Sequence, residues 1–474
     1  MPFVTFFSFR NKILSVMPID LRSNSSDFFY PPHAAPLKGT ENFFYATWKF
    51  MRNPIEGFGP LAYSQPITSV KTMGVQMHVI TDPDGMNTVL GTHAKNFSKT
   101  AIDSRILGPA TKEGLLSVHG EQWKRQRRAV APMFRKRHMA DLAPDITTVL
   151  DGFKAKLERH PSVELNVAMA DLTFDVLAKC LLGDPQGLNR ARLKRATRRV
   201  VTSAGTLRPD DMLPLPRGVP RPIGPRGVLA LRELKSAADA LLKSREKAPG
   251  DDLVGLLTSA VDPHTGQSLS VRERRDNLIG FFIAGHETTA LTLTWALYLV
   301  GRHAPTAVRI AKEVKEVCGS APIQYDDVDK LVFTRAVIDE TMRLFPPAPI
   351  LNRECLEPCT VSERQMNVGD ILLLCPYVMH RTERLWQNPL AFDPDRFMRD
   401  PSLRAKGAPF LPFGAGPRIC VGLSFALMEA VMGLADLVRD YEIEIADDCF
   451  PRPLMTVTLR PEGGIPARFV KRTS

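Results

Sequence analysis

Near the C-terminus the sequence reads FGAGPRICVG, from Phe413 to Gly422, and in it three glycines and a proline surround a single cysteine. The first two glycines are spaced G-x-G, but Ile419 stands where a dinucleotide-binding motif needs its third glycine, and no phosphate loop follows. No other cysteine lies within zinc-finger or redox-pair spacing of Cys420. The stretch therefore specifies a rigid loop around one thiol for a purpose other than nucleotide or zinc binding.

The position of Cys420 favours an anionic sulfur. It lies just before an amphipathic helix expected from Leu423, where free backbone N–H groups and the helix dipole stabilise a thiolate. Glycines at 414, 416 and 422 remove side chains where the backbone must approach something flat or adopt a positive φ. A haem iron with a thiolate ligand requires such a loop. The alternative is a buried structural cysteine in a helix-entry loop, and the rest of the chain must decide between them.

The length and composition of the chain favour one large domain. Its 474 residues, 44% of them hydrophobic, can bury a large core, and no linker, low-complexity tract or internal repeat divides them. The seven cysteines are odd in number and scattered, which is typical of free thiols in a reducing compartment. We therefore expect a cytoplasmic protein.

The first twelve residues, MPFVTFFSFRNK, argue against a targeting signal or a membrane span. Their short apolar run precedes the basic residues, which is the reverse of the order in a signal peptide. The run is also far shorter than the roughly 20 apolar residues of a spanning helix. We expect no membrane-spanning segment, and weak contact with a lipid surface stays open.

The net charge of +11 is concentrated in three basic runs, at 124–128, 135–138 and 190–199. Such patches can bind nucleic acid, but the interleaved aromatic residues and the recognised nucleic-acid modules are missing. A solvated helix face is the commonest meaning of a charge run. Docking of an acidic protein is the third interpretation, and the motifs below favour it.

The hydrophobic pattern predicts a mainly α protein with small β-sheets. A strand-like alternation runs from about Thr68 to Asp82 and ends in a Pro-Asp-Gly turn. GDILLLCP at 369–376 indicates a buried strand, and the segment from Pro453 indicates a terminal hairpin. Apolar residues at three-and-four spacing predict helices at 121–135, 142–158, 166–182, 226–245, 271–303, 305–318, 327–344 and from Leu423.

The opening stretch resembles the haem-binding loop of the cytochrome P-450 family position by position. The matching residues are Phe413, Gly414, Gly416, Arg418, Cys420 and Gly422. The resemblance implies the cytochrome P-450 fold, a large helical domain with a long central helix over the haem and minor sheet mostly near the N-terminal part. It also implies that Cys420 is the iron ligand and that Phe413, Gly414, Arg418 and Gly422 bind the cofactor. Since it begins at about Phe43, we expect an N-terminal extension at 1–42 without a transmembrane helix and a single domain at 43–474.

The segment ETMR, Glu340 to Arg343, places an acid and a base on one helix face. In a chain with 24% charged residues, this arrangement can be an ordinary surface ion pair. It also resembles the E-x-x-R motif of the family, in which a buried pair is joined by an arginine from a later loop. FDPDRF supplies Arg396 for that place. The resemblance implies a structural role for the three residues in holding the loop of Cys420.

The segment AGHETTALT lies within the long apolar helix expected at 271–303. Glu287 and Thr288 are costly there unless they line a wet pocket, although a threonine can also bond back to its own helix. The matching acid and alcohol of the family lie over the haem. The resemblance implies that Thr288 relays protons, that Glu287 is the acid of the relay, and that Ala284 leaves room for oxygen.

The segment GEQWKRQRR places Trp123 and Arg127 one helical turn apart, where an N–H donor beside a cation suits a carboxylate. The resemblance implies that these residues and Arg418 bind the haem propionates. Arg353 and His380 lie in regions that often add donors, and a purely structural role is an equal alternative for each. The rest of the basic run is expected to dock an acidic ferredoxin or a flavin reductase.

The resemblance implies a haem-thiolate monooxygenase that inserts one oxygen atom from dioxygen into a hydrophobic substrate, with a fatty acid or a terpenoid favoured. The implied cofactor is haem b, iron protoporphyrin IX, bound non-covalently. The sequence contains no flavin or nicotinamide motif, so electrons are expected from a separate redox partner. The alternatives are an isomerase, dehydratase or peroxygenase of the same fold, or a non-catalytic haem sensor.

The substrate pocket is expected to be apolar, by analogy with the family. Each candidate for its wall is equally plausible as a core residue. The candidates are Ile106, Leu107, Leu115, Phe281, Phe282, Ala284, Pro349, Ile350 and the turn from Met455 to Val457.

The segment CLEPC contains a second pair of cysteines, Cys355 and Cys359. Their spacing fits neither a zinc hook nor C-x-x-C, and no histidine flanks them. The sequence therefore favours a structural role for both thiols.

Overall fold

The structure is a computed structural model that describes residues 28–72, 74–182, 190–204, 208, 211, 219, 221–247, 250 and 252–472. The opening segment MPFVTFFSFRNK lies outside these ranges. Within them, no helix has the length and apolar character needed to cross a membrane.

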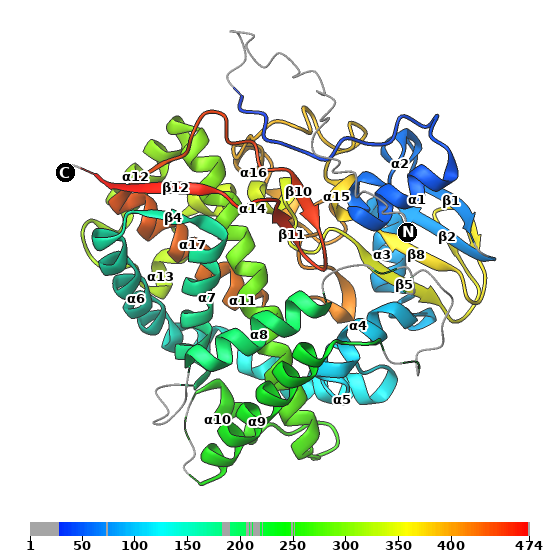
Figure 1. Ribbon diagram of the computed structural model, residues 1–474, viewed down its shortest axis with the longest axis horizontal. Coiled ribbons are helices and arrows are strands. Elements are labelled where there is room, and N and C mark those ends of the chain that lie inside the picture. The colour runs from blue at the N-terminus through cyan, green and yellow to red at the C-terminus, as the bar shows by residue number, and fades with distance from the viewer. Residues whose placement is uncertain are drawn as a thin grey trace, which may run out of the picture.

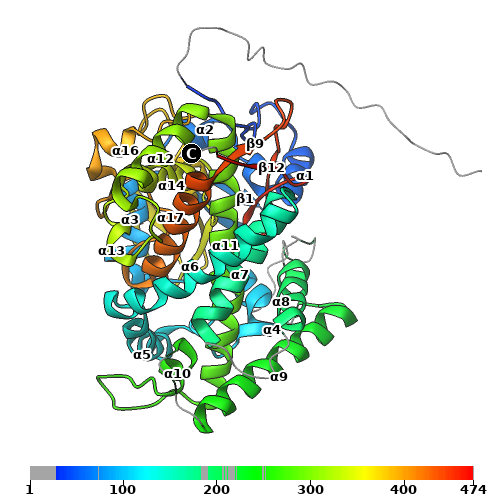
Figure 2. The same cartoon turned by 90° about the vertical axis from the view of Figure 1, so that its left-hand side faces the viewer.

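The long helix α11 (Val271–Arg302) runs through the middle of the molecule (Figures 1 and 2). It begins at a capping box, in which Ser270 and Glu273 satisfy free N–H groups of the first turn. Every residue from Leu291 to Val300 is buried, as expected for a helix that is apolar on all sides. Helices α7 (Leu165–Leu182), α14 (Val332–Leu344) and α17 (Leu423–Asp440) pack against it. The predicted central helix is therefore present, and it forms the axis of the core.

The remaining helices surround this core. They are α1 (Phe43–Arg52), α2 (Pro60–Ser64), α3 (Pro83–Asn87), α4 (Ala101–Thr111), α5 (Gly120–Val130), α6 (Lys136–Arg159), α8 (Arg190–Ala204), α9 (Pro225–Lys247), α10 (Leu253–Thr258), α12 (Ala304–Cys318), α13 (Tyr325–Val328), α15 (Pro376–Met379) and α16 (Arg396–Arg399).

The helix expected at 327–344 is divided into α13 and α14. The Glu313 carboxylate of α12 accepts the backbone N–H groups of Phe333 and Thr334 at 2.6 and 2.8 Å. This long-range cap begins α14 at a point that no local sequence signal marks.

The main sheet has five strands and joins distant parts of the chain. Its order is β1 (Ile67–Thr72), β2 (Val75–Ile80), β8 (Ile371–Leu374), β5 (Leu351–Cys355) and β3 (Phe97–Ser98). The contact between β2 and β8 is parallel, and the other contacts are antiparallel. Figure 1 shows this sheet to one side of the helical body. It positions β5, which carries two residues of the cavity described below.

Three smaller sheets complete the architecture of the described segments. They are β4 (Ser162–Glu164) with β12 (Pro466–Lys471) and β9 (Tyr441–Glu444), β10 (Pro453–Met455) with β11 (Leu459–Pro461), and β6 (Cys359–Val361) with β7 (Arg364–Met366). The predicted terminal hairpin is thus β10 and β11, whereas β12 pairs with β4 and β9 instead. The predicted fold class, mainly α with small sheets, is confirmed.

Candidate active site

A cavity of about 400 Å³ lies between the middle of α11 and the loop that contains Cys420. Most of its wall is apolar, and the polar residues in it come from the segment after β3, from α5, α11 and β5, and from the cysteine loop. Predicted residues in its lining are Leu115, Trp123, Arg127, Phe281, Ala284, Thr288, Arg353, Phe413, Gly414, Arg418, Cys420 and Gly422. Segments separated by some 300 residues therefore meet at one site.

The cysteine loop has a backbone that only glycine permits at two points. Gly414 and Gly416 have φ values of 69° and 66°. A Cβ atom on Gly416 would lie 1.8 Å from the Leu90 carbonyl oxygen, so no side chain fits there. The Cys420 N–H donates to the Phe413 carbonyl at 3.0 Å and closes the loop on itself. The loop thus presents the Cys420 side chain to the cavity in a fixed position.

Opposing influences act on the protonation of Cys420. Burial raises the pKa of its thiol above the ordinary value, whereas the Gly422 N–H and the Arg127 guanidinium lower it. Burial is the larger influence, so the helix end alone does not make this sulfur a thiolate. A metal cation bound to a thiol removes the proton outright. The Gly422 N–H and the Arg127 guanidinium are the groups that would stabilise the sulfur in its ionised form.

Three guanidinium groups line the same cavity, and the one described carboxylate that acts on them, that of Asp103 on Arg353, lies beyond ion-pair distance. Arg127, Arg353 and Arg418 come from α5, β5 and the cysteine loop, and within the described ranges no acidic side chain lies within ion-pair distance of any of them. Burial lowers the pKa of all three, and that of Arg418, with Arg353 nearby, to about 10. The Arg418 guanidinium lies over the ring of Trp123, 4.4 Å from its centroid. Because buried cations need counter-charges, the cavity fits a ligand that carries carboxylates, as haem does.

Lys99 is a cavity residue that the sequence reasoning missed. It follows β3, lines the cavity, and donates from Nζ to the Leu116 carbonyl. Burial lowers the pKa of its ammonium group to about 8. No motif marks it, and the only available signal was a lysine directly after a short buried strand. It adds a fourth cationic group to the lining.

Thr288 lies in the cavity wall on α11. Its hydroxyl donates to the Ala284 carbonyl at 2.9 Å, and the Thr292 hydroxyl donates to the Thr288 carbonyl at 3.0 Å. Thr292 and Gly285 also line the cavity. The side-chain oxygen of Thr288 keeps its acceptor lone pairs for a further partner, because it donates its single proton to the helix. The structure thus places this alcohol in the cavity wall, and its role in a proton relay stays a prediction.

The structure separates Glu287 from the cavity. Its carboxylate accepts a hydrogen bond from the Thr458 hydroxyl at 2.6 Å and forms an ion pair with Arg460, and it is absent from the cavity lining. Successive residues of an α-helix point about 100° apart, so Glu287 faces the β10–β11 hairpin when Thr288 faces the cavity. The expectation that both line one relay is therefore corrected for the acid.

Several predicted wall residues also lie outside the cavity lining. Phe282 is fully buried and stacks on Phe174, with 6.2 Å between the ring centroids, because it faces α7 when Phe281 faces the cavity. Predicted wall residues from α4 and from the turns near β5 and β10 also lie outside the cavity lining. These residues are Ile106, Leu107, Pro349, Ile350, Met455 and Val457. Apolar side chains in the wall that were not predicted are Leu90, Leu116, Leu177, Leu253, Met342 and Phe425.

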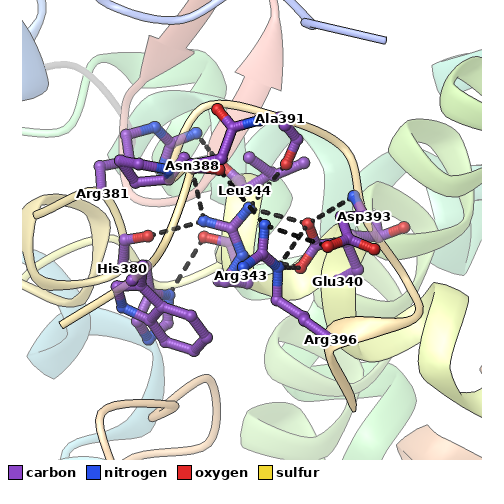
Figure 3. Close-up of polar contacts among 12 residues, drawn as sticks. Glu340, Arg343, Leu344, His380, Arg381, Asn388, Ala391, Asp393 and Arg396 are labelled. Carbon is purple, nitrogen blue, oxygen red and sulfur yellow. Dashed lines mark hydrogen bonds and ion pairs between the residues drawn. The ribbon is translucent and has the colours of Figure 1, made fainter. Parts of the chain in front are cut away.

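A buried polar cluster lies at the C-terminal end of α14 (Figure 3). Arg343 is fully buried and donates twice to the Glu340 carboxylate, at 2.7 and 2.8 Å. It also donates to the carbonyls of His380 and Pro389, both at 2.7 Å, and to that of Ala391 at 3.0 Å. One side chain therefore ties α14 to three main-chain positions of the segment 380–391.

Arg396 joins the same cluster, as Figure 3 shows. It donates to the Glu340 carboxylate at 3.2 Å and to the carbonyls of Gln387 and Asn388 at 3.0 and 3.3 Å. The Asp393 N–H donates to the same carboxylate at 2.9 Å. The structure thus brings together the three residues predicted to form a structural cluster, and they lie outside the cavity.

His380 connects this cluster to the cysteine loop. Its Nδ1 lies 3.1 Å from the Arg343 carbonyl, and its Nε2 accepts the Leu411 N–H at 3.0 Å. The neutral ring that satisfies both contacts carries its proton on Nδ1. Leu411 precedes Phe413 by two residues, so the imidazole positions the chain as it enters the loop. Both ring nitrogens are used, so the sequence alternative of a cofactor donor is excluded for His380 and the structural one holds.

Acidification is expected to destabilise the fold through His380. Burial, with Arg343 and Arg381, lowers the pKa of this imidazole to about 3. The unfolded chain takes up a proton below about pH 6.5, whereas the folded chain stays neutral until about pH 3. Over this interval the free energy of unfolding should fall by about 1.4 kcal/mol per pH unit from this group.

Urea unfolding of the wild type and of His380→Gln at pH 7.5, 6.0 and 5.0 checks this prediction. Other buried histidines whose pKa is lowered, such as His286 and His303, add to the slope of both proteins. The difference between the two slopes therefore isolates His380. Equal slopes would contradict the assignment.

Comparison with known proteins decides the family. The family model for cytochrome P-450 matches residues 61–466, which is most of the chain. The chain belongs to the cytochrome P-450 family. It is accordingly a cytochrome P-450 monooxygenase, of the family in which a cysteine thiolate ligates haem.

Three relatives show which members of this family the chain is similar to. Cyclooctatin synthase of Streptomyces melanosporofaciens is 29% identical over 363 residues, 76% of this chain and 79% of the relative. A cytokinin hydroxylase of Arabidopsis thaliana is 30% identical over 376 residues, 74% and 71% of the two chains. The protein LUTEIN DEFICIENT 5, chloroplastic, of the same plant is 28% identical over 429 residues, 83% and 70% of the two chains. This cytochrome P-450 therefore resembles bacterial and plant members to a similar degree.

Proposed function

We propose that this cytochrome P-450 uses haem b, ligated by Cys420, to insert one oxygen atom from dioxygen into a hydrophobic substrate. The observation that carries the proposal is a single cavity that unites the thiol, three guanidinium groups that form no ion pair with a carboxylate of the described residues, and the Thr288 alcohol. We also propose residues 43–474 as one catalytic domain and 1–42 as an extension. The seven cysteines, all free thiols in the structure, support a reducing compartment such as the cytoplasm.

The residues of the chain divide the work of holding the cofactor. Cys420 provides the sulfur ligand, and Phe413, Gly414 and Gly422 let the backbone approach a flat macrocycle. Arg127, Arg353 and Arg418 with the Trp123 N–H bind the two propionates, and the charges of those carboxylates balance the cluster. Bound haem with a thiolate ligand supplies the activation of dioxygen.

The substrate is expected to be hydrophobic, with a fatty acid or a terpenoid favoured. The wall of the cavity above the cysteine is formed largely by leucine and phenylalanine side chains, and its volume lies within the range of small-molecule sites. The relatives named a hydroxylase and a synthase support oxidation of a small molecule. Ala284 and Gly285 are small residues, so the part of α11 beside Thr288 leaves space in the cavity.

Electrons are proposed to come from an acidic ferredoxin or a flavin reductase that docks on the basic surface. Part of this basic charge is neutralised within the protein, because Arg125 and Arg128 form ion pairs with acidic residues in the segment 262–273. Arg135 and Arg137 are exposed and have no acidic partner in the described part of the chain. A rate of reduction that falls steeply as ionic strength rises would support this docking.

The absorption spectrum of the reduced protein with carbon monoxide tests the proposed function. A strongly red-shifted Soret band is expected, because a thiolate donates electron density to the iron. The next step is to screen fatty acids and terpenoids for shifts in spin state. A protein that contains no haem, or that gives a histidine-type carbonyl spectrum, would overturn the proposal.

Thr288→Ala is expected to retain haem but to lose coupling between electrons and product. The variant keeps the helix and the apolar wall, and it removes the hydroxyl that orients protons. Product formed per NAD(P)H should fall by at least about tenfold, and peroxide should rise, since proton transfer by a positioned group contributes this much or more. The measurement compares NAD(P)H consumption, peroxide and product with a reductase and any substrate found in the screen.

Thr294→Ala is the matched control for this prediction. Thr294 lies on the same helix, is fully buried, and donates to its own i−4 carbonyl, that of Ala290, at 2.7 Å, but it lies outside the cavity lining. The Thr294→Ala variant should form as much product per NAD(P)H as the wild type. Full coupling in Thr288→Ala would rule out the relay role.

A peroxygenase is the second candidate, and the position of Glu287 favours it. The carboxylate is held by Arg460 and Thr458 rather than facing the cavity, so the acid of the expected relay does not reach the site in this arrangement. Product formation from hydrogen peroxide without a reductase, at a rate equal to that with a redox partner, would support this candidate. Product formation only with a redox partner would exclude it.

A further inference from the structure

Two thiols meet in the turn between β5 and β6, outside the cavity. Cys355 is the last residue of β5 and Cys359 is the first residue of β6. The two thiols lie near enough for each to act on the other's pKa, and the Cys355 thiol donates a hydrogen bond to the Glu357 carbonyl oxygen of the turn at 3.1 Å. Both cysteines are free thiols. The turn therefore holds the two sulfur atoms near each other.

The backbone on both sides of the pair is fixed by strands. The Cys355 N–H donates to the Asp370 carbonyl, and its own carbonyl accepts the Gly369 N–H, both at 2.9 Å. Cys359 pairs with Met366 in the hairpin of β6 and β7. The two sulfur atoms thus belong to different sheets that a short turn joins. A covalent link between them would connect these sheets.

The two thiols differ in access. Cys355 is fully buried, whereas Cys359 is partly exposed. Burial raises the pKa of both, that of Cys355 to about 11, and the hydrogen bond from Cys355 acts to lower the pKa of Cys359. Cys359 is therefore the sulfur that a dissolved oxidant reaches first and that ionises more readily. Cys355 is placed to attack it from the protein side.

A metal role for the pair finds no support. In the described segments, no group of three or more His, Cys, Asp or Glu side chains is arranged to hold a metal ion. Two neighbouring thiols, one accessible and one buried, instead match the arrangement of a reactive cysteine beside its resolving partner. We propose that Cys355 and Cys359 form an oxidation site that closes to a reversible intramolecular disulfide.

The reaction with hydrogen peroxide balances in two steps. The Cys359 thiolate attacks one peroxide oxygen, the O–O bond breaks, and a sulfenic acid forms while hydroxide leaves and takes up the proton released by the thiol. Cys355 then attacks the Cys359 sulfur, the S–S bond forms, and the sulfenic oxygen leaves as water with the Cys355 proton. The thiols lose two electrons and peroxide becomes two water molecules. A thiol such as glutathione reverses the change by exchange.

The disulfide would act on a strand that reaches the cavity. β5 also carries Leu351 and Arg353, which line the cavity, and Arg353 is only two residues from Cys355. Closing the pair would fasten the β6–β7 hairpin to the end of this strand. Local opening of the segment 356–366 should then become rarer, because a cross-link removes open conformations. Slower hydrogen exchange in that segment after oxidation is the expected physical effect.

Mass spectrometry of a single tryptic peptide tests the proposal on the intact, haem-loaded protein. Cleavage after Arg353 and Arg364 releases residues 354–364, which contain Cys355 and Cys359 and no other cysteine. After hydrogen peroxide and alkylation under denaturing conditions, the peptide should lack both alkyl groups and be lighter than the reduced peptide by two hydrogen atoms. Dithiothreitol should restore double alkylation. A peptide that stays doubly alkylated, while Cys449 on the same protein is oxidised, would overturn the proposal.

Two variants test the assigned order of attack. In Cys355→Ser, the sulfenic acid on Cys359 has no resolving thiol, so it should be trapped by dimedone, whereas the wild type should give little adduct there. Cys449→Ser is the matched control, because Cys449 is also partly exposed and belongs to another segment. It should leave disulfide formation in 354–364 unchanged. Dimedone labelling of Cys359 to the same extent in the wild type and in Cys355→Ser would contradict a resolving role for Cys355, even if Cys355→Ser folds less well.

Discussion

Cys420→Ala is expected to abolish the red-shifted carbonyl band and all oxygen insertion while leaving the fold intact. Among the described residues, the side chain is the only thiol in the cavity lining, and the lining contains no histidine. The other sulfur atom in the lining is the Met342 thioether, which lies on α14 and not on this loop. The loop itself should persist. Its closing hydrogen bond joins the backbone N–H of residue 420 to the Phe413 carbonyl, and the alanine variant keeps both groups.

The measurement is the carbonyl spectrum together with circular dichroism and product analysis, each compared with Cys449→Ala. Cys449 lies beyond the cavity, and its sulfur has no assigned role, so that variant should match the wild type in all three. A red-shifted band in Cys420→Ala would show that a different cysteine ligates the iron. Loss of helical signal would show instead that Cys420 supports the fold, which its position at the cavity wall argues against.

The parts of the site that could be predicted from the sequence are those whose geometry is local. The stretch 413–422 encodes its own loop, because Gly416 has a positive φ and a backbone oxygen where a Cβ would lie. The spacing of Glu340 and Arg343 likewise places both on one face of any helix. In such cases residue type and spacing alone determine the arrangement. The family resemblance then supplied Arg396 as their partner.

The rotation of a helix about its axis could not be predicted in this way. Thr288 and Phe281 face the cavity, whereas their neighbours Glu287 and Phe282 face the β10–β11 hairpin and α7. Neighbouring residues differ by about 100° in direction, so an error of one position moves a side chain out of the site. The direction is set by how α11 packs against elements that lie more than 100 residues away.

Contacts between a side chain and distant main-chain groups could not be predicted from the sequence either. His380 binds the Arg343 carbonyl and the Leu411 N–H, which lie 37 and 31 residues away and leave no trace in a motif. The pair Cys355 and Cys359 is a different case. Their spacing argued against a metal or redox motif, but the structure places the two thiols near enough to interact across the turn between two strands. The spacing of two cysteines in the sequence can exclude known motifs, but it does not exclude that their side chains lie close together in the fold.

Arg343→Ala is expected to cause a large loss of stability in this cytochrome P-450. The change leaves the Glu340 carboxylate without its two strongest donors, although Arg396 and the Asp393 N–H stay. It also removes the donor from three carbonyls of the segment 380–391. Breaking a buried ion pair costs about 3–5 kcal/mol, a large share of the roughly 5–15 kcal/mol that holds a typical domain folded.

The same change should also reduce haem retention, and this second effect distinguishes a positioning role from simple destabilisation. The Arg343 carbonyl binds His380, and His380 binds Leu411 just before the cysteine loop, so movement of α14 displaces the loop that carries Cys420. Urea unfolding and the carbonyl band per protein measure the two effects. Arg468→Ala is the control, since its exposed pair with Glu444 at 3.7 Å should contribute less than about 1 kcal/mol. A folded Arg343→Ala protein with the stability of Arg468→Ala and a full carbonyl band would show that the cluster does not hold the loop.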